Sequence, residues 1–360
     1  MQVKVLVVDD SRFYRNRLCE ILASDPNILI VGTADNGREG VEKTLSLKPD
    51  VITMDIEMPI MDGISAVREI MQKRPTPILM LSSLTAEGAQ STLDALDAGA
   101  VDFLLKRLDK LTYKKAEFTG AICGKIRALG GSSVHFRKQA LANGNAELRS
   151  SPRRANGDRQ ANSLERGEPL SEKFRIIVIG ASTGGPVAVQ SILSALPSNY
   201  AVPILVVQHM PASFTGSFAH RLDALSKLGI KEAEDGDVLA AGKVYVAPGG
   251  RQLVLVEKGG RPLVKIRDSY ENEQYKPSVD ITYKSVAELY GKQALAIILT
   301  GMGSDGRDGA AFLKKSGSVV WAQDENTCIV FGMPHAVINA GLADRVLPIA
   351  EIAQQLALGG

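Results

Sequence analysis

The sequence predicts an α/β protein in which a flexible linker joins two doubly wound domains. Short β-branched runs of strand length alternate with helical patterns up to about residue 125, and the same alternation resumes near residue 173. A polar stretch rich in glycine separates the two regions. The chain has 360 residues, of which 45% are hydrophobic, and this is enough for two or three cores. We therefore expect domains over 1–125 and 173–360 and a linker over 126–172.

The first domain is expected to contain a five-stranded parallel sheet. Its apolar runs are bounded by Gly, Pro, Asp or Asn, as buried strands often are. Helical segments between them supply the crossovers that parallel strands need, and Ser11 and Asn36 are placed as helix N-caps. The predicted strands are Lys4–Val8, Ile28–Thr33, Val51–Met54, Ile78–Leu81 and Asp102–Leu105, and the predicted helices are Arg12–Ser24, Gly37–Leu47, Ile64–Lys73 and Gln90–Ala98.

The second domain is expected to have a Rossmann-like, mainly parallel sheet. Before it, from Gly131 to about Glu172, the chain has too little apolar surface to offset the entropy of ordering it, which predicts flexibility. The predicted strands are Arg175–Ile179, Pro203–Val207, Val244–Ala247, Gln252–Val256, Leu263–Ile266, Ala294–Leu299 and Val319–Ala322, and helical patterns follow several of them, for example Pro186–Ala195, Val279–Tyr290 and Asp308–Lys315.

Composition excludes several classes of protein. The formal net charge is +2, from 42 basic and 40 acidic residues, so nucleic acid is not a favoured partner. The three cysteines fit no zinc spacing and no even disulfide framework, which favours a reducing cytoplasm. The N-terminal MQVKVLVVDD does not have the pattern of a signal peptide, and no apolar run approaches the length of a membrane span. We expect a cytoplasmic monomer that does not insert into a membrane.

Charged and polar residues follow four strands of the first domain, at the edge where ligands bind in such sheets. Asp9 and Asp10 follow the first strand, Asp55 the third, Ser82 the fourth and Lys106 the fifth. Converging carboxylates favour a hard cation such as Mg²⁺, and the lysine would stabilise a phosphoryl group transferred to the central aspartate. Alternatively, the first two aspartates only cap a helix and the lysine is solvated; the joint placement at three strand ends makes this interpretation the weaker one.

These segments resemble the receiver domain of two-component response regulators. VLVVDDSR, VITMDIEMPIMDG, LMLSS and DFLLK carry the resemblance, over about residues 1–125. It implies a histidine kinase as phosphodonor and a need for Mg²⁺ in phosphorylation. It also implies these roles: Asp55 as phosphoacceptor, Asp10 and Asp55 as metal ligands with Asp9 assisting, the main-chain carbonyl of Glu57 as a further ligand, and Ser82 and Lys106 as support for the phosphoryl group. The sequence departs from the family at Arg107, where proline is usual, so no cis X-Pro bond can form there.

A possible nucleophile lies in the second domain, in the segment IIVIGASTGGPVAV of residues 176–189. The turn has neither the G-x-G-x-x-G frame nor the G-K-[ST] ending of a phosphate-binding loop. It does contain G-x-S-x-G between a strand and a helix, which predicts an exposed Ser182 hydroxyl. Pro186 lies at the start of the helix, where its missing N–H group would have no partner within the helix. The other N–H groups of the first turn can face an oxyanion.

A serine needs a base, and the base needs an acid. His209 ends the second strand of this domain, on the edge that carries Ser182, and is the best candidate, with His335 a distant second. His135 lies in the predicted linker and His220 inside an amphipathic helix. The glycine-rich loop in AIILTGMGSDGRDG offers Asp305 as the acid, although GMGSDG could be only a flexible turn. We expect Asp308 to cap the next helix.

Together these motifs resemble the catalytic domain of the CheB family of chemotaxis protein-glutamate methylesterases. GASTGGP, QHMP, KPSVD, LTGMGSDG and FGMP carry the resemblance, over about residues 174–357. It implies hydrolysis of glutamate methyl esters on methyl-accepting chemoreceptors, which releases methanol, and often deamidation of receptor glutamines. It implies a triad of Ser182, His209 and Asp305, supported by Thr183 and Met302, with no cofactor for hydrolysis. It also implies that the unphosphorylated receiver packs over the catalytic edge.

Two other functions compete with hydrolysis. In a non-enzymatic module, phosphorylation would gate a glycine-loop domain that binds a nucleotide or a protein; Ser182→Ala would then leave activity intact and a nucleotide would raise thermal stability. A DNA-binding regulator is disfavoured, because the second half is α/β, has no helix-turn-helix pattern and carries no basic stripe.

Overall fold

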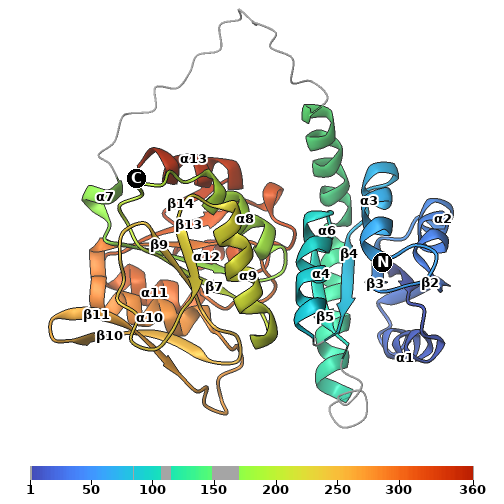
Figure 1. Cartoon of the computed structure of the whole chain (residues 1–360), viewed down its shortest axis with the longest axis horizontal. Helices are drawn as coiled ribbons and strands as arrows, with labels where there is room; N and C mark the ends of the chain where they lie inside the picture. Colours follow the sequence, from blue (N-terminus) through green and yellow to red (C-terminus); the bar gives the residue numbers. More distant parts are fainter. Residues whose placement is uncertain (1, 84, 107–114, 148–169, 360) are drawn as a thin grey trace, which may run out of the picture.

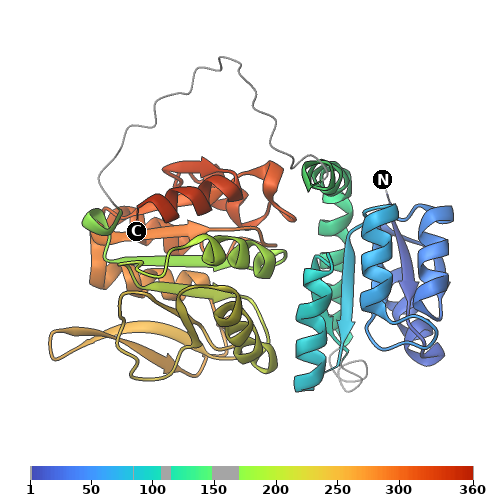
Figure 2. The ribbon, with the colours of Figure 1, turned by 45° about the horizontal axis from the view of Figure 1, so that its top comes forward.

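The computed structural model describes residues 2–83, 85–106, 115–147 and 170–359. It has two α/β domains, each with a parallel sheet covered by helices on both faces (Figures 1 and 2). The fold class predicted from the sequence is confirmed. Within the described ranges, no helix has the length and apolar character needed to cross a membrane.

The first domain has a five-stranded sheet of order β2-β1-β3-β4-β5, and every neighbouring pair is parallel. Helices α2, α3 and α4 share one buried cluster with the sheet, and α1 and α6 share another on its opposite face. Ser11 and Asn36 are N-caps, as predicted. The elements are β1 (Val3–Val8), α1 (Arg12–Ala23), β2 (Ile28–Ala34), α2 (Gly37–Leu47), β3 (Val51–Asp55), α3 (Gly63–Lys73), β4 (Ile78–Ser82), α4 (Ala86–Asp97), β5 (Asp102–Leu105) and α6 (Lys115–Glu147).

Helix α6 corrects one expectation from the sequence. Residues 126–147 were expected in a flexible linker, and they are helical. Phe118, Ile122, Ile126 and Leu129 recur at helical spacing and are all buried in the cluster shared with β1 and α1. Packing of this stripe stabilises the helix despite its glycines and serines, whose intrinsic helix propensity is low. Residues 148–169 of the predicted linker lie outside the described residues, and its last three residues, 170–172, are helical.

The second domain has a seven-stranded parallel sheet of order β14-β13-β12-β6-β7-β9-β8 and a separate antiparallel hairpin, β10–β11. Helices α8, α9 and α13 pack on one face of the sheet, and α10, α11 and α12 on the other. The elements are α7 (Leu170–Lys173), β6 (Ile176–Ala181), α8 (Gly185–Ala195), β7 (Ile204–Gln208), α9 (Ala212–Leu225), β8 (Gly229–Glu232), β9 (Lys243–Val246), β10 (Gln252–Lys258), β11 (Arg261–Arg267), α10 (Val279–Tyr290), β12 (Ala294–Ile298), α11 (Arg307–Lys315), β13 (Val319–Gln323), α12 (Met333–Asn339), β14 (Arg345–Leu347) and α13 (Ile349–Leu358).

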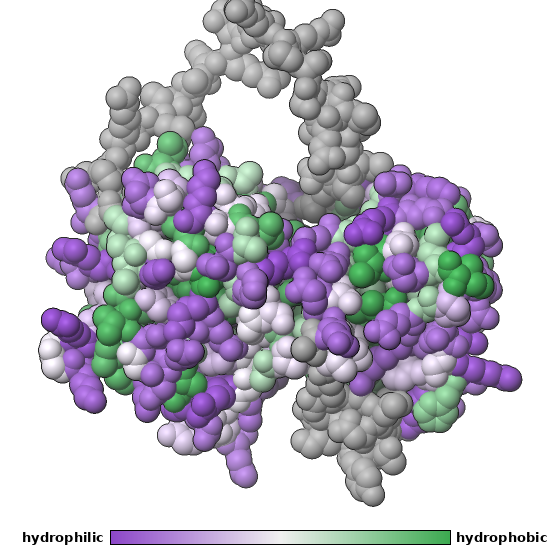
Figure 3. Space-filling model, in the orientation of Figure 1, coloured by the Kyte–Doolittle hydropathy of each residue, from purple (hydrophilic) through white to green (hydrophobic). Residues whose placement is uncertain are grey.

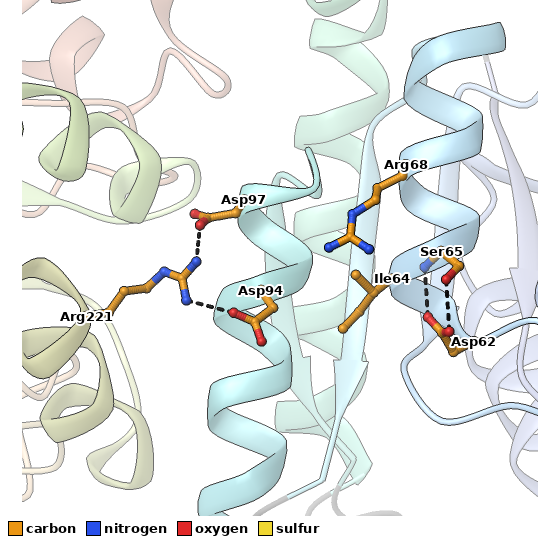
Figure 4. A pocket seen from close by; sticks show the side chains of 7 residues that line it. All are labelled: Asp62, Ile64, Ser65, Arg68, Asp94, Asp97 and Arg221. Atoms are coloured by element: carbon orange, nitrogen blue, oxygen red, sulfur yellow. Dashed lines mark hydrogen bonds and ion pairs between the residues drawn. The ribbon is translucent and has the colours of Figure 1, made fainter. Parts of the chain in front are cut away.

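The two domains contact each other through α4, β5 and α6 of the first, which face the second (Figures 1 and 2). Phe103 of β5 stacks on Phe214 of α9, with ring centroids 4.4 Å apart. Arg221 of α9 forms ion pairs with Asp94, at 2.7 Å, and with Asp97, both on α4 (Figure 4). Hydrophilic side chains lie over the junction on the face shown in Figure 3. An apolar contact with charged pairs beside it therefore holds the domains together.

Candidate active site and phosphoryl-acceptor pocket

Ser182 lies in a tight turn between β6 and α8. Its main-chain N–H donates to the carbonyl of Thr300 at 3.0 Å, and its own carbonyl accepts from Gly185 at 2.8 Å. Gly184 has φ 77°, and a Cβ there would lie 2.6 Å from Ile329 Cγ1, so only glycine fits. The turn therefore holds the Ser182 hydroxyl at the carboxyl edge of the sheet, close to the N-terminus of α8.

His209 follows β7, the strand beside β6. The register pairs Ala181 with Gln208, so Ser182 and His209 are the next residues on the two strands. His209 N–H donates to the Ala181 carbonyl at 3.0 Å, and His209 Nε2 lies 2.7 Å from Asp305 Oδ2. No hydrogen bond between the Ser182 hydroxyl and His209 is found in the described chain; such bonds often form only with substrate. Nδ1 remains the ring nitrogen available to the serine.

Asp305 is buried, at 3% exposure, and its carboxylate is held from several sides. Oδ1 accepts from Ser278 Oγ at 2.9 Å and from Asp280 N–H at 3.0 Å, and Oδ2 accepts from Val279 N–H at 2.7 Å. Burial acts to raise the pKa of Asp305, but the bonds from His209 and from the first turn of α10 lower it below its ordinary value. The loop that carries Asp305 is thus an anchored acid site, and the alternative of a flexible turn is wrong.

The sequence reasoning missed two residues that contact the predicted ones: Tyr275, whose ring stacks on His209, and Asp280, whose N–H donates to Asp305. Asp280 Oδ1 accepts from the N–H groups of Gly306, at 2.9 Å, and Gly309, at 2.6 Å. It therefore satisfies the amide donors at the start of α11, which Asp308 was expected to do. Asp308 instead pairs with Arg307 at the surface, at 2.8 Å. Burial, with the nearby Asp305 carboxylate, raises the pKa of Asp280 to about 7.

The carboxylates of the first domain meet as predicted. Ligand oxygens of Asp9, Asp10 and Asp55 all lie within 4.8 Å of one another, a donor set that fits a hard divalent cation. Lys106 Nζ lies 2.7 Å from Asp9 Oδ2 and 2.6 Å from Asp55 Oδ2, so the alternative of a solvated lysine is wrong. Burial raises the pKa of Asp55 to about 6, although Lys106 acts to lower it. A cation there would favour the charged form.

Three other predictions for this pocket have different outcomes. The Ser82 hydroxyl is buried and turns toward α4: it donates to the Gly88 carbonyl at 3.2 Å and accepts from Thr92 Oγ1 at 2.6 Å. Its role beside a phosphoryl group stays a prediction. Glu57 is exposed, and a role for its main-chain carbonyl stays a prediction too. Arg107 lies outside the described residues.

Comparison with known proteins supports the same division of the chain. The profile of the CheB methylesterase family matches residues 177–356, and that of the response regulator receiver domain matches residues 5–116. A protein-glutamate methylesterase/protein-glutamine glutaminase of Pseudomonas syringae is 48% identical, with 99% of each chain covered. The chain belongs to the CheB methylesterase family. A protein-glutamate methylesterase/protein-glutamine glutaminase of Vibrio parahaemolyticus is also 48% identical, over 99% of this chain and 98% of its own.

The solved structure of a family member agrees with the second domain. The CheB methylesterase catalytic domain of Thermotoga maritima is 47% identical, has a TM-score of 0.50, and covers 51% of this chain and 97% of its own. The catalytic half of this CheB-family chain is therefore the part described above by its seven-stranded sheet.

In this CheB-family chain, receiver residues reach the turn beside the candidate nucleophile. Thr183, which is buried, donates from Oγ1 to Asp102 Oδ2 at 2.6 Å and accepts from Lys125 Nζ at 3.2 Å; Lys125 also pairs with Asp102. Met302 is 36% exposed, and a Cβ on Gly124 of α6 would lie 2.8 Å from its Cε. The receiver domain thus touches both residues predicted to support the site.

Of the other histidines, His335 and His220 have no hydrogen bond to Ser182 or Asp305 within the described part of the chain. His335 is exposed, packs edge-on against Phe331, and lies 3.0 Å from Asn339 Nδ2. His220 is exposed on α9. The side chain of His135 lies outside the described part of the chain, although its main chain belongs to α6. His209 is therefore the histidine whose position suits a base for Ser182.

Proposed function

We propose that the chain hydrolyses glutamate methyl esters, and deamidates glutamines, on methyl-accepting chemoreceptors. The relatives that cover nearly its whole length carry these two activities in their names. One observation supports the chemistry most directly: a histidine bonded to a buried carboxylate at 2.7 Å lies next in register to a serine in a G-x-S-x-G turn. These residues supply a nucleophile, a base and an acid on one sheet edge.

The proposed reaction is acyl transfer to water. His209 Nδ1 takes the proton from Ser182 Oγ as the oxygen attacks the γ-carbonyl carbon. Asp305 stabilises the imidazolium through Nε2. The imidazolium then protonates the leaving group, which departs as methanol from an ester or ammonia from an amide. Water, deprotonated by the same histidine, cleaves the acyl-serine and gives the glutamate carboxylate.

Main-chain donors near Ser182 support an oxyanion site. Within the described part of the chain, the N–H groups of Thr183 and Met302 donate to no protein acceptor. Gly185 begins α8 directly after the turn, so the positive end of that helix faces the same region. Donors of this kind stabilise the charge that develops on the carbonyl oxygen.

A test of the reaction uses a methylated receptor peptide and mass spectrometry. The wild-type chain should remove the methyl group, and Ser182→Ala should lower the rate by at least about 10³-fold, because no other group can form the acyl intermediate. Ser194→Ala, an exposed serine on α8, is the matched control and should retain the wild-type rate. Full demethylation by Ser182→Ala would show that Ser182 is not the nucleophile, and a wild-type chain that removes no methyl group would favour the non-enzymatic module instead.

The receiver domain is proposed to control this reaction through phosphorylation of Asp55 by a histidine kinase. Asp9, Asp10 and Asp55 would hold Mg²⁺, which when bound neutralises charge on the incoming phosphoryl group. Lys106, already within 2.7 Å of two of these carboxylates, adds a fixed positive charge. Hydrolysis itself is proposed to need no cofactor, because Ser182, His209 and Asp305 supply its acid and base groups.

The contact between the domains supports inhibition of the unphosphorylated chain. Asp102 and Lys125 bind Thr183, the residue after the nucleophile, and Arg221 binds α4. Ser82 links the phosphoryl pocket to α4 through Gly88 and Thr92. A phosphoryl group on Asp55 would compete for the Ser82 hydroxyl, which would shift α4 and weaken the contact.

A further inference from the structure

The imidazole of His209 lies flat against the ring of Tyr275. The ring centroids are 4.5 Å apart and the planes differ by only 6°, so the two rings are stacked in parallel. Tyr275 belongs to the segment between β11 and α10, two residues before the Pro277-Ser278 step that leads into the helix. The stack covers one face of the imidazole, while Asp305 contacts its edge at Nε2.

The main chain and the hydroxyl end of Tyr275 each lie against a neighbouring segment. Gln252, fully buried at the start of β10, donates from Nε2 to the Tyr275 carbonyl at 2.7 Å and accepts from Ser278 N–H at 2.9 Å. At the other end, a Cβ on Gly303 would lie 2.8 Å from the Tyr275 hydroxyl. The segment that anchors Asp305 through Ser278, Val279 and Asp280 therefore also presents the tyrosine to the histidine.

The imidazole needs such support because one hydrogen bond at one atom does not fix its plane. The outer torsion of a histidine has broad minima, so the ring can rotate while Nε2 keeps contact with Asp305. A second ring stacked at 4.5 Å restricts that rotation. The Nδ1 atom then keeps its direction relative to Ser182, which lies next in register.

The stack also suits the charge that forms during the reaction. The face of a neutral phenol ring is electron-rich and attracts a cation lying over it. Burial raises the pKa of Tyr275, with a further contribution from the Asp305 and Asp280 carboxylates, so the phenol keeps its proton. The contact is therefore stronger with the imidazolium than with the neutral imidazole.

We propose that Tyr275 is a positioning residue of the active site: its ring holds the His209 imidazole in the plane needed by Ser182 and stabilises the imidazolium. This role rests on the proposed triad. It requires the aromatic ring and not the hydroxyl, which distinguishes it from a role in substrate binding through hydrogen bonds.

The test compares Tyr275→Phe with Tyr275→Leu in the full chain, treated with a small phosphodonor and Mg²⁺. Demethylation of a receptor peptide gives kcat and KM. Tyr275→Phe should remain within about twofold of the wild type, and Tyr275→Leu should lower kcat by about 3- to 30-fold with KM nearly unchanged, because the lost stabilisation applies to the transition state. Tyr275→Met is a second ring-free variant of similar volume, in case Tyr275→Leu does not fold.

A second readout needs no receptor. The rate at which phenylmethanesulfonyl fluoride inactivates the chain depends on activation of the serine by its base, and it should fall in the ring-free variants by a factor similar to that for kcat. An unchanged kcat in both ring-free variants, or a rise in KM alone, would overturn the role of Tyr275. The triad has its own control: an active Ser182→Ala would refute the nucleophile, whatever the tyrosine variants do.

Discussion

At the residue scale, Asp305 and Asp280 connect the loop before α11 with the first turn of α10 through reciprocal hydrogen bonds. Main-chain N–H groups of α10 donate to Asp305, and main-chain N–H groups of the loop and α11 donate back to Asp280. The Asp305 carboxylate thus satisfies amide donors at the start of α10, and the Asp280 carboxylate satisfies amide donors at the start of α11. Two acidic groups lie close together inside the protein, and the neighbouring N–H groups compensate part of their repulsion.

This pair predicts a pH-dependent stability that Asp280→Asn removes. The pKa of Asp280 is raised to about 7 in the folded chain, from 3.8 when unfolded. Its contribution to stability is therefore fully present below about pH 4 and is lost as the pH rises through about 7. An asparagine accepts the same two N–H bonds without a charge. The Tm of the wild type should therefore fall more than that of Asp280→Asn when the pH is raised from 5 to 8.

Calorimetry of the full chain at both pH values measures this difference. Asp308→Asn removes an exposed carboxylate from the same turn and serves as the control; its Tm should change between the two pH values as that of the wild type does. The same Tm difference between wild type and Asp280→Asn at pH 5 and pH 8 would contradict the raised pKa.

The sequence marked some candidate site residues and not others, for a physical reason. Ser182, His209 and Asp305 each follow a buried strand, and parallel strands bring their carboxyl ends to one edge. Tyr275 lies in an irregular segment whose place depends on Gln252, and Asp280 lies in the first turn of α10, where an acidic residue is ordinary. No periodicity or strand end marks them, although KPSVD was already among the motifs that carried the resemblance.

At the scale of elements, local patterns located the described strands except β8 and β14, and they did not locate the helices α6, α7 and α13. The predicted strands agree with the observed ones to within two residues at either end. Strand β14 was missed because it has only three residues, and β8 because GIKE has no apolar run, unlike the equally short β5 and β9. Helix α6 was not predicted, because its glycines and serines mask an apolar stripe that becomes stable by packing on the sheet.

The packing of α10 against α11 predicts the effect of a single methyl group. A Cβ on Gly309 would lie 2.7 Å from Tyr283 Cβ and 2.8 Å from Asp280 Cα, atoms that cannot move without shifting a helix. Gly309→Ala should therefore lower the free energy of unfolding by about 1–3 kcal/mol. Gly120, in α6, has nothing within 4 Å of its Cβ position, so Gly120→Ala should raise stability by about 0.5–1 kcal/mol.

Urea denaturation of the two alanine variants and the wild type checks both signs. The Gly309→Ala transition should move to lower urea concentration and the Gly120→Ala transition to higher concentration. A Gly309→Ala chain as stable as the wild type would mean that α10 and α11 can separate at little cost, and that the bonds between Asp280 and the start of α11 are not rigidly held.

At the scale of the whole molecule, the domain contact joins two sites that the sequence treats as separate. The phosphoryl pocket lies at one end of the receiver sheet, and Ser82 links it to α4. The same domain reaches Thr183 through Asp102 and Lys125. Nothing in the sequence marks Phe103, Phe214 or Arg221 as partners, since each has an ordinary composition and spacing within its own element.

The contact predicts that Arg221→Ala raises the activity of the unphosphorylated chain. Arg221 forms two ion pairs with α4, and the exposed fractions of the Asp94 and Asp97 side chains are 42% and 37%. After solvent screening the two pairs together are worth about 1 kcal/mol, so their loss should raise basal methanol release by about fivefold. Lys265→Ala, which removes a comparable surface pair with Asp235 inside the catalytic domain, should leave the basal rate unchanged.

With a small phosphodonor and Mg²⁺, Arg221→Ala and wild type should converge on one rate, because phosphorylation opens the same contact. Equal basal rates for Arg221→Ala and the wild type, or a wild-type rate that the phosphodonor does not change, would show that this contact does not limit access to Ser182.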